Sequence, residues 1–449
     1  MKTMKIFTKV LVILLVVVTA VLLVRAVFNY AMGKKLENYL AEAKAEGIPL
    51  ALKDIAPSCP DPDNAAPLWK AAEALFILPD EKDRKLAFDT VGAFFDGKPF
   101  DEAARQTLAR LCGKNRRVFE LIAEAAARPC LRFGDWTKAP WAIEQVKAMK
   151  TIQVTRLLGI DAVLQADAGQ VREGLEECRN GMHFVRKLMD EPWLLNNLVA
   201  LSEMKVLLIC FDRIARGRGI DSATLAAWMN EMNFDFWRHQ SVRWIPTERL
   251  IGLEWGLKVI GGKPGDASAA LSLLGDEKGI DRFFYWLVRP VLKSQFIWVH
   301  KRYGDLEKIA PEPYYKQNEF LNKRNLERVP WYYRPTGVLF ADFRGVFLKE
   351  AALEAMMLTT KAGLACKIYK NKTGRYPESL GALVPDLLPE VPIDPFTGKP
   401  LIYKIQSGEL LIYSLGSNQK DDGGRMTYQI TKLIMDKDDD WTWREKINP

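Results

Sequence analysis

Residues 374–424 read GRYPESLGALVPDLLPEVPIDPFTGKPLIYKIQSGELLIYSLGSNQKDDGG, and this stretch decides the fold of the C-terminal part of the chain. Its prolines, spaced from Pro377 to Pro400, exclude a long helix. Residues 401–405 and 410–414 are short runs rich in β-forming side chains, and the loop between them contains Gly408. Such a pattern predicts an antiparallel hairpin.

A helix is predicted directly before this stretch. Residues 351–370 place apolar side chains at roughly helical spacing, and Gly374 can end the helix in a left-handed conformation. A single helix packed on a small hairpin forms an α+β unit, which we assign to residues 341–430. Residues 431–449 are assigned as a tail, in which the acidic run Asp438-Asp439-Asp440 is expected to remain solvated.

The order of these signals resembles the C-terminal region of the major pseudopilin of type II secretion systems. The shared elements are a helix ending in Gly-x-Tyr-Pro, then Leu-Pro-x-x-Pro-x-Asp-Pro, a hairpin and Ser-Leu-Gly. The resemblance covers residues 341–424, under a fifth of the chain. It implies a pseudopilin-like fold for the C-terminal unit.

The resemblance also implies a candidate calcium site in the loop after the hairpin. Leu415 falls where the family offers a backbone carbonyl, and Asn418 where it usually offers an aspartate. The family's later Asp-x-Asp pair falls on residues 427–429, which carry no carboxylate. Asp421 and Asp422 are the candidate replacements, because calcium accepts six to eight oxygens in flexible geometry. The alternative, which we favour, is a solvated turn and a protein without a cofactor.

The N-terminus departs from the pseudopilin pattern. It has no Gly-Phe-Thr-Leu-x-Glu-like processing site, and about three hundred residues separate its apolar run from the pseudopilin-like helix. The chain is therefore not expected to be a pilus subunit. An atypical pseudopilus component remains an alternative.

Residues 1–30 are predicted to form a transmembrane anchor. As a helix, residues 6–28 span about 34 Å, which is roughly the thickness of a bilayer core. Cleavage of a signal peptide near Val18-Thr19-Ala20 is the alternative, but the apolar run continues to Val24. Lys2, Lys5 and Lys9 favour a cytoplasmic N-terminus, although basic residues also follow the apolar run. We expect a single-pass protein of the cytoplasmic membrane with an extracytoplasmic body.

The remaining residues predict a mainly α-helical protein. Residues 31–64 form a linker helix and a Pro-rich connection, and residues 65–340 an irregular, solenoid-like helical body. Within this body, residues 152–168, 171–189 and 194–216 are long amphipathic stretches. Their first join resembles the turn of a tetratricopeptide-type hairpin, but the full repeat does not recur. Surfaces of this type more often bind partners than catalyse reactions.

The composition fits a folded body next to a membrane. The chain has 449 residues, is 48% hydrophobic and carries a formal net charge of +8. No nucleic-acid-binding motif accompanies this charge, so no nucleic-acid partner is predicted. Of the six cysteines, Cys210 and Cys366 lie in apolar segments typical of buried thiols. Cys112 with Cys130 is one candidate disulfide, although sequence cannot establish the connectivity.

Catalytic motifs do not stand out in the sequence. The three histidines lack metal-binding spacing, and no nucleophile elbow, phosphate-binding loop or dinucleotide fingerprint occurs. We therefore predict a non-catalytic scaffold or interaction protein of the bacterial envelope, with an envelope protein as its partner and a possible link to secretion. The alternative is an enzyme acting on envelope polymers, with a site in the aromatic region 233–340.

Overall fold

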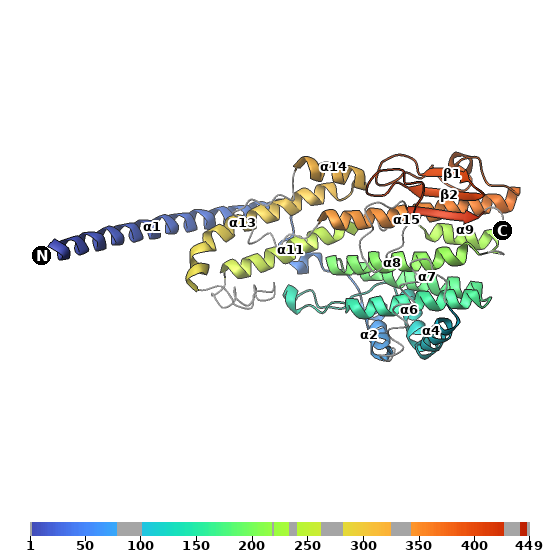
Figure 1. Cartoon of the computed structure of the whole chain (residues 1–449). Helices are drawn as coiled ribbons and strands as arrows, with labels where there is room; N and C mark the ends of the chain where they lie inside the picture. Colours follow the sequence, from blue (N-terminus) through green and yellow to red (C-terminus); the bar gives the residue numbers. More distant parts are fainter. Residues whose placement is uncertain are drawn as a thin grey trace.

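The computed structural model describes residues 2–78, 101–217, 220–232, 240–261, 282–324, 343–425 and 441–446. It is mainly helical, with a three-stranded sheet and a long N-terminal helix that projects from the body (Figure 1). This confirms the mainly α architecture and the N-terminal apolar helix.

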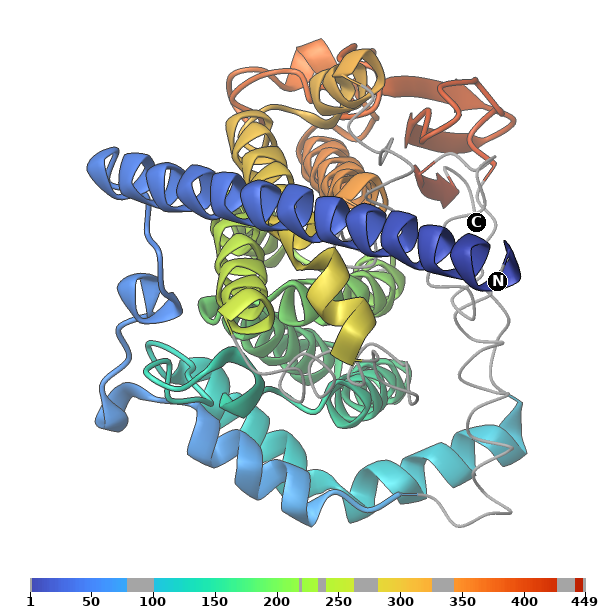
Figure 2. The ribbon, with the colours of Figure 1, turned by 90° about the vertical axis from the view of Figure 1, so that its left-hand side faces the viewer.

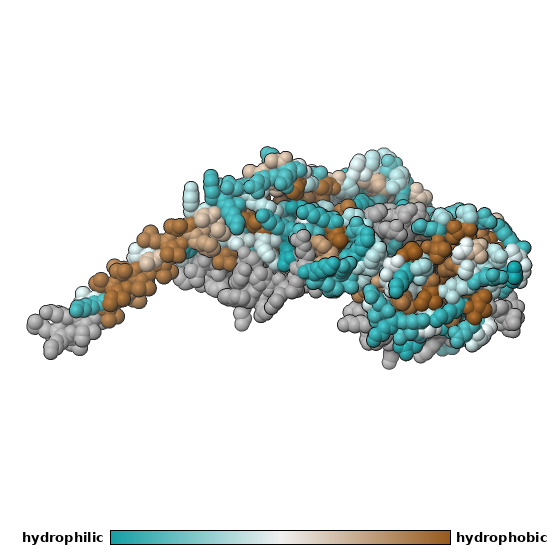
Figure 3. All heavy atoms as spheres, turned by 90° about the horizontal axis from the view of Figure 1, so that it is seen from above, coloured by the Kyte–Doolittle hydropathy of each residue, from teal (hydrophilic) through white to brown (hydrophobic). Residues whose placement is uncertain are grey.

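Helix α1 runs without interruption over Lys2–Ala45. The apolar side chains from Val10 to Val24 are exposed, and they form a continuous hydrophobic surface (Figure 3). Further along the same helix, Leu36 and Ala43 are buried in the body. Helix α1 therefore has a membrane-compatible half and a half that belongs to the folded core.

The predicted helical stretches of the body are confirmed closely. Helices α6 (Ala148–Asp167), α7 (Val171–Lys187) and α8 (Leu194–Ala215) pack on one another. Gly169, with φ of 90°, makes the turn between α6 and α7. Helix α8 is also long and apolar enough to cross a membrane, but most of it is buried inside the body. It is therefore a core helix.

Shorter helices flank this trio. Asp101 caps α4 (Glu102–Lys114) by accepting a hydrogen bond from Ala104 N, and Asp221 caps α9 (Ser222–Glu231) by accepting one from Thr224 N. These outer helices are α2 (Ala66–Leu75), α4 (Glu102–Lys114), α5 (Arg116–Ala127) and α9 (Ser222–Glu231). Short 3-10 helices occupy Leu52–Ile55, Asp61–Asp63, Pro140–Ala142, Leu188–Asp190 and Leu380–Leu383.

The described helical body includes three further helices. They are α11 (Gln240–Gly261), α13 (Arg282–Ile309) and α14 (Tyr314–Arg324). Helix α13 packs on both α1 and α11, and Figure 2 shows α1 crossing in front of the body. Residues 233–239, 262–281 and 325–340 of the predicted aromatic region lie outside the described residues.

The C-terminal unit has the predicted helix and hairpin. Helix α15 (Phe343–Thr373) ends at Gly374, whose φ is 78°, and β1 (Ile402–Gln406) pairs antiparallel with β2 (Glu409–Ser414). Within the segment assigned as a tail, β3 (Trp441–Lys446) pairs antiparallel with β2, so these residues belong to the sheet. Trp443 drives this pairing, since its ring is completely buried. The Asp438-Asp439-Asp440 run lies outside the described residues.

The largest hydrophobic core is continuous between the helical body and the C-terminal unit. It contains Trp69 of α2 and Phe211 of α8 together with Leu364 of α15 and Trp443 of β3. A separate cluster joins Leu36 of α1 to α11 and α13. Packing therefore connects the C-terminal unit to the helical body, and helix α1 to α11 and α13.

The disulfide bond corrects the candidate pairing from the sequence. Cys59 is bonded to Cys130, whereas Cys112 is a buried free thiol. Cys112 lies on α4, where burial raises its pKa well above the usual value. Cys178, Cys210 and Cys366 are also free and buried, as predicted for the last two.

Candidate functional site

The candidate site lies where helix α1 meets the body. Arg25 of α1 stacks on Trp286 of α13, with its guanidinium carbon 3.5 Å from the ring centroid. One turn further, Lys293 Nζ donates a hydrogen bond to Asn29 Oδ1 at 3.1 Å. These contacts fasten the first part of α13 to the end of the apolar segment.

Directly after these contacts, α1 and α13 line a half-open cavity of about 520 Å³. Its lining contains three lysines and one glutamate, which gives a formal charge of 3 − 1 = +2. The lining residues are Tyr30, Ala31, Lys34, Lys35, Asn38, Tyr39, Glu42, Ile297 and Lys301.

Helical periodicity explains this arrangement. The α1 residues from Tyr30 to Glu42 recur at intervals of three or four, or as neighbours, so they share one face of the helix. Ile297 and Lys301 are four residues apart and form the facing stripe on α13. No residue of this cavity is predicted from the sequence as part of a site. The lysine pair Lys34-Lys35, which follows the apolar run, is the sequence feature that could have indicated the cavity.

A buried polar cluster lies behind the cavity. The Tyr39 hydroxyl is 2.5 Å from His300 Nδ1, and Arg249 Nε donates to His300 Nε2 at 3.1 Å. Arg249 Nη1 also forms an ion pair with Glu307 Oε2 at 2.7 Å. The cluster connects α1, α11 and α13.

The electrostatics of this cluster favour a structural role. Burial and the neighbouring Arg249 charge lower the pKa of His300 to about 3. Burial also raises the pKa of Tyr39 and that of Glu307. A histidine with so low a pKa is neutral and weakly basic near pH 7, so it is a poor general base. We therefore interpret the cluster as a lock that sets the angle of helix α1 relative to α11 and α13.

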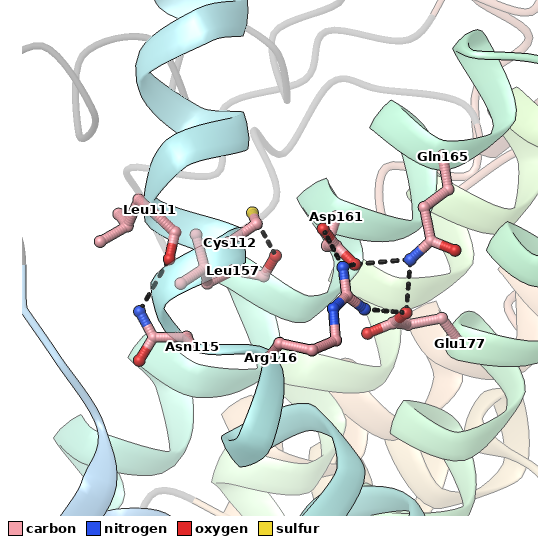
Figure 4. Close-up of polar contacts among 8 residues, drawn as sticks. All are labelled: Leu111, Cys112, Asn115, Arg116, Leu157, Asp161, Gln165 and Glu177. Carbon is pink, nitrogen blue, oxygen red and sulfur yellow. Dashed lines mark hydrogen bonds and ion pairs between the residues drawn. The ribbon is translucent and has the colours of Figure 1, made fainter.

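A second polar cluster lies on the helical body (Figure 4). Arg116 of α5 forms ion pairs with Asp161 of α6 at 2.8 Å and with Glu177 of α7 at 3.3 Å. Gln165 Nε2 donates to both carboxylates at 2.6 Å. Burial, followed by repulsion from Asp161, raises the pKa of Glu177 to about 7. Three helices share this network, so its most direct consequence is to fix their packing.

The residues of the candidate calcium site are only partly brought together. Asn418 Nδ2 donates to Asp422 Oδ2 at 2.8 Å, so these two side chains are neighbours. Leu415 N donates to Asp394 Oδ2 at 3.1 Å. Asp421 faces the hairpin and accepts from Tyr413 at 2.8 Å and from Lys404 Nζ at 3.0 Å.

These partners matter for calcium, because Lys404 already neutralises the Asp421 carboxylate. Hydrogen bonds from Tyr413, then from Lys404, lower the pKa of Asp421. Within the described part of the chain, no group of three or more His, Cys, Asp or Glu side chains is arranged to hold a metal ion. The donor set seen here therefore fits a metal poorly, and calcium stays a prediction.

The carboxylates of the described aromatic region have separate partners. Glu248 accepts a hydrogen bond from Leu194 N, and Glu254 accepts one from Leu52 N. Each thus satisfies a backbone group of a different segment. The enzyme alternative for residues 233–340 stays a hypothesis.

Comparison of the chain with protein-family models, curated proteins and solved structures finds no match. The pseudopilin resemblance of the C-terminal unit stays a prediction.

Proposed function

We propose that this protein is a non-catalytic scaffold of the bacterial envelope, anchored in the cytoplasmic membrane and carrying an extracytoplasmic body that docks a protein partner. The observation that carries this proposal is the unbroken course of α1. Its exposed apolar half continues into a half that buries Leu36 and contacts His300 through Tyr39. A helix built into the core in this way favours a retained anchor over a cleaved signal peptide.

The compartment is inferred from the cysteines and the flanking charges. Cys59 and Cys130 form a disulfide, and such bonds persist mainly in oxidising compartments. Lys2, Lys5 and Lys9 precede the apolar run and favour a cytoplasmic N-terminus. Both observations support a body on the extracytoplasmic side.

Docking is inferred from the shape of the body and from its exposed apolar side chains. Helices α6, α7 and α8 pack as consecutive neighbours, which supports a solenoid-like binding surface. In the pseudopilin-like unit, the apolar side chain of Ile405 is 51% exposed on β1. We assign partner docking to this unit, with secretion proteins as the class that its resemblance suggests.

Membrane anchoring is tested with the full chain and two double variants. Leu14→Arg with Val17→Arg should release the protein from carbonate-washed membranes, because each arginine costs about 3 kcal/mol at the centre of a bilayer. Leu14→Ile with Val17→Ile is the matched control and should remain bound. Release of the wild type by carbonate would contradict the anchor. Proteolysis of spheroplasts should remove the body and leave the N-terminus protected.

Docking is tested by crosslinking intact envelopes and capturing the full chain. Ile405→Ser should reduce the yield of the crosslinked partner, whereas Leu195→Ser, at a similarly exposed apolar position on α8, should not. An unchanged set of crosslinked proteins in the Ile405 variant would reject docking through the C-terminal unit. An intact N-terminus by mass spectrometry would exclude the pseudopilus alternative, which needs cleavage.

A further inference from the structure

We propose that the cavity between α1 and α13 binds the phosphodiester headgroup of an anionic phospholipid. This inference rests on the membrane anchor of the proposed function. It adds a ligand class and a binding site that anchoring alone does not require.

The cavity lies just beyond the end of the apolar segment of α1. Phe28 ends the apolar segment, and Lys34 follows six residues later, which corresponds to about 9 Å along the helix. The headgroup region extends roughly 5–8 Å beyond each side of the hydrocarbon core. Tyr30, about 3 Å beyond Phe28 along the helix, therefore falls within the headgroup region, and Lys34 falls at its outer edge, where its long side chain can reach back to lipid phosphates.

The cavity lining carries an excess of positive charge. In the part of the chain that the structure describes, neither Lys34 nor Lys35 forms an ion pair, and both side chains are exposed. Lys301 reaches over the Tyr39 ring, with its ammonium 5.4 Å from the centroid. The cavity lining therefore combines three lysines with one carboxylate, Glu42. An anionic ligand would offset this excess.

The other lining residues offer both polar and apolar groups to a ligand. Tyr30 and Asn38 offer a hydroxyl and an amide for the polar part of a headgroup, while Ile297 and Ala31 offer apolar contact. The volume of about 520 Å³ lies within the range of small-molecule sites. A phosphodiester that carries a short polyol, such as phosphatidylglycerol, matches this combination.

The cavity is connected to the buried polar cluster of the body. Tyr39 lines the cavity and also contacts His300, which belongs to the lock with Arg249. A headgroup in the cavity would thus lie against the residues that set the anchor angle. Such a site would hold the body at a defined orientation to the membrane surface.

The test uses the full chain in nanodiscs of phosphatidylcholine, alone or mixed with phosphatidylglycerol. Native mass spectrometry measures the phosphatidylglycerol that the protein retains on release into detergent. The cavity variant is Lys34→Gln with Lys35→Gln and Lys301→Gln. The control is Lys44→Gln with Lys53→Gln and Lys138→Gln, three exposed lysines outside the cavity lining. Both variants carry the same net charge, and circular dichroism confirms that both are folded.

The expected result is retention of phosphatidylglycerol by the wild type and the control, with about tenfold weaker retention by the cavity variant. If the cavity variant and the control lose phosphatidylglycerol retention equally, the retention depends on overall surface charge, and the proposal is overturned. The same follows if the wild type shows no preference for phosphatidylglycerol. Titration with inorganic phosphate distinguishes the ligand source, since binding as tight as that of the lipid would overturn a lipid site.

Insertion into nanodiscs is measured first and separates the two levels of inference. Failure of the wild type to insert would overturn the anchor and the headgroup site together. Insertion without selective lipid retention would overturn the headgroup site alone.

Discussion

Asp394 and Ser414 are joined by a hydrogen bond of 2.8 Å, from the serine hydroxyl to Asp394 Oδ1. This contact connects the Asp-Pro-Phe-Thr-Gly turn to the end of strand β2. The same carboxylate accepts from Phe396 N at 3.0 Å and from Leu415 N at 3.1 Å, and it is almost completely buried. The turn at Asp394 and the Ser-Leu-Gly segment after β2 are therefore held together by the Asp394 carboxylate.

Replacing Asp394 with asparagine should destabilise the protein by about 2–3 kcal/mol. The amide would present one donor group to backbone N–H groups that now face a carboxylate, and buried polar groups left unpaired are costly. Chemical denaturation of the wild type and the variant measures the difference. Asp386→Asn is the control, since Asp386 is exposed, and it should change stability by less than about 0.5 kcal/mol. Equal stability of wild type and Asp394→Asn would contradict this structural role.

Helices and turns that depend on local sequence patterns could be predicted, whereas elements that depend on contacts between distant residues could not. The apolar periodicity of residues 152–216 gave three helices within a few residues of their observed ends. The β-formers around Gly408 likewise gave the hairpin. Strand β3 was missed, because its pairing depends on Trp443 inserting beneath α15, far away in sequence.

The sites show the same limit. Asp161 and Glu177 share Arg116 only because α6 and α7 fold back on each other against α5. Cys59 and Cys130 are 71 residues apart, and neither neighbourhood indicates the partner. The cavity needs Lys301 next to the lysine pair of α1, which no spacing rule links.

Gly363 should be intolerant of a larger side chain. A Cβ at this position of α15 would lie 2.3 Å from the Trp443 ring, so alanine must displace the tryptophan. We expect Gly363→Ala to cost about 1–3 kcal/mol and to alter the near-ultraviolet circular dichroism. Gly113→Ala in α4 is the matched control, because nothing lies within 4 Å of its Cβ. It should stabilise the protein by about 0.5–1 kcal/mol. Similar effects of both substitutions would show that β3 does not pack as described.

Stability should fall as the pH rises toward neutrality, in part through Glu350. Burial raises its pKa to about 7, although Trp244 Nε1 and Asn197 Nδ2 each donate to it at 3.0 Å. Because the folded-state pKa exceeds the unfolded value of 4.5, the folded protein binds more protons between these values. The stabilisation is complete below the unfolded pKa and is lost as the pH rises through about 7.

Thermal unfolding from pH 5 to pH 8 measures this dependence. The wild-type Tm should decrease over this interval, and Glu350→Gln should flatten the decrease. Glu378→Gln, at an exposed position, should leave the slope unchanged. A wild-type slope retained in Glu350→Gln would assign the effect to other groups.

Thiol accessibility should follow the observed pairing. Cys112, Cys178, Cys210 and Cys366 are free but buried, and burial raises the pKa of each thiol. An alkylating reagent should label none of them in the native protein, four thiols in denaturant, and six after reduction. Peptide mapping should then identify the Cys59–Cys130 bond. Removing it by Cys59→Ser with Cys130→Ser should cost about 4 kcal/mol, because the loop that it closes is long. A native protein with six reactive thiols would contradict both the pairing and the burial.

Calcium should leave the stability of the protein unchanged. Lys404 Nζ lies 3.0 Å from Asp421 Oδ2, so an ion in this loop must compete with a positive charge that is already in place. We expect equal Tm values in calcium and in chelator for the wild type. Lys404→Gln frees the Asp421 carboxylate next to Asp422, and this variant offers the most favourable background for binding. A calcium-dependent rise in the wild-type Tm would show that the loop rearranges into the pseudopilin-like site. A rise in the variant alone would identify the lysine as the group that excludes the ion.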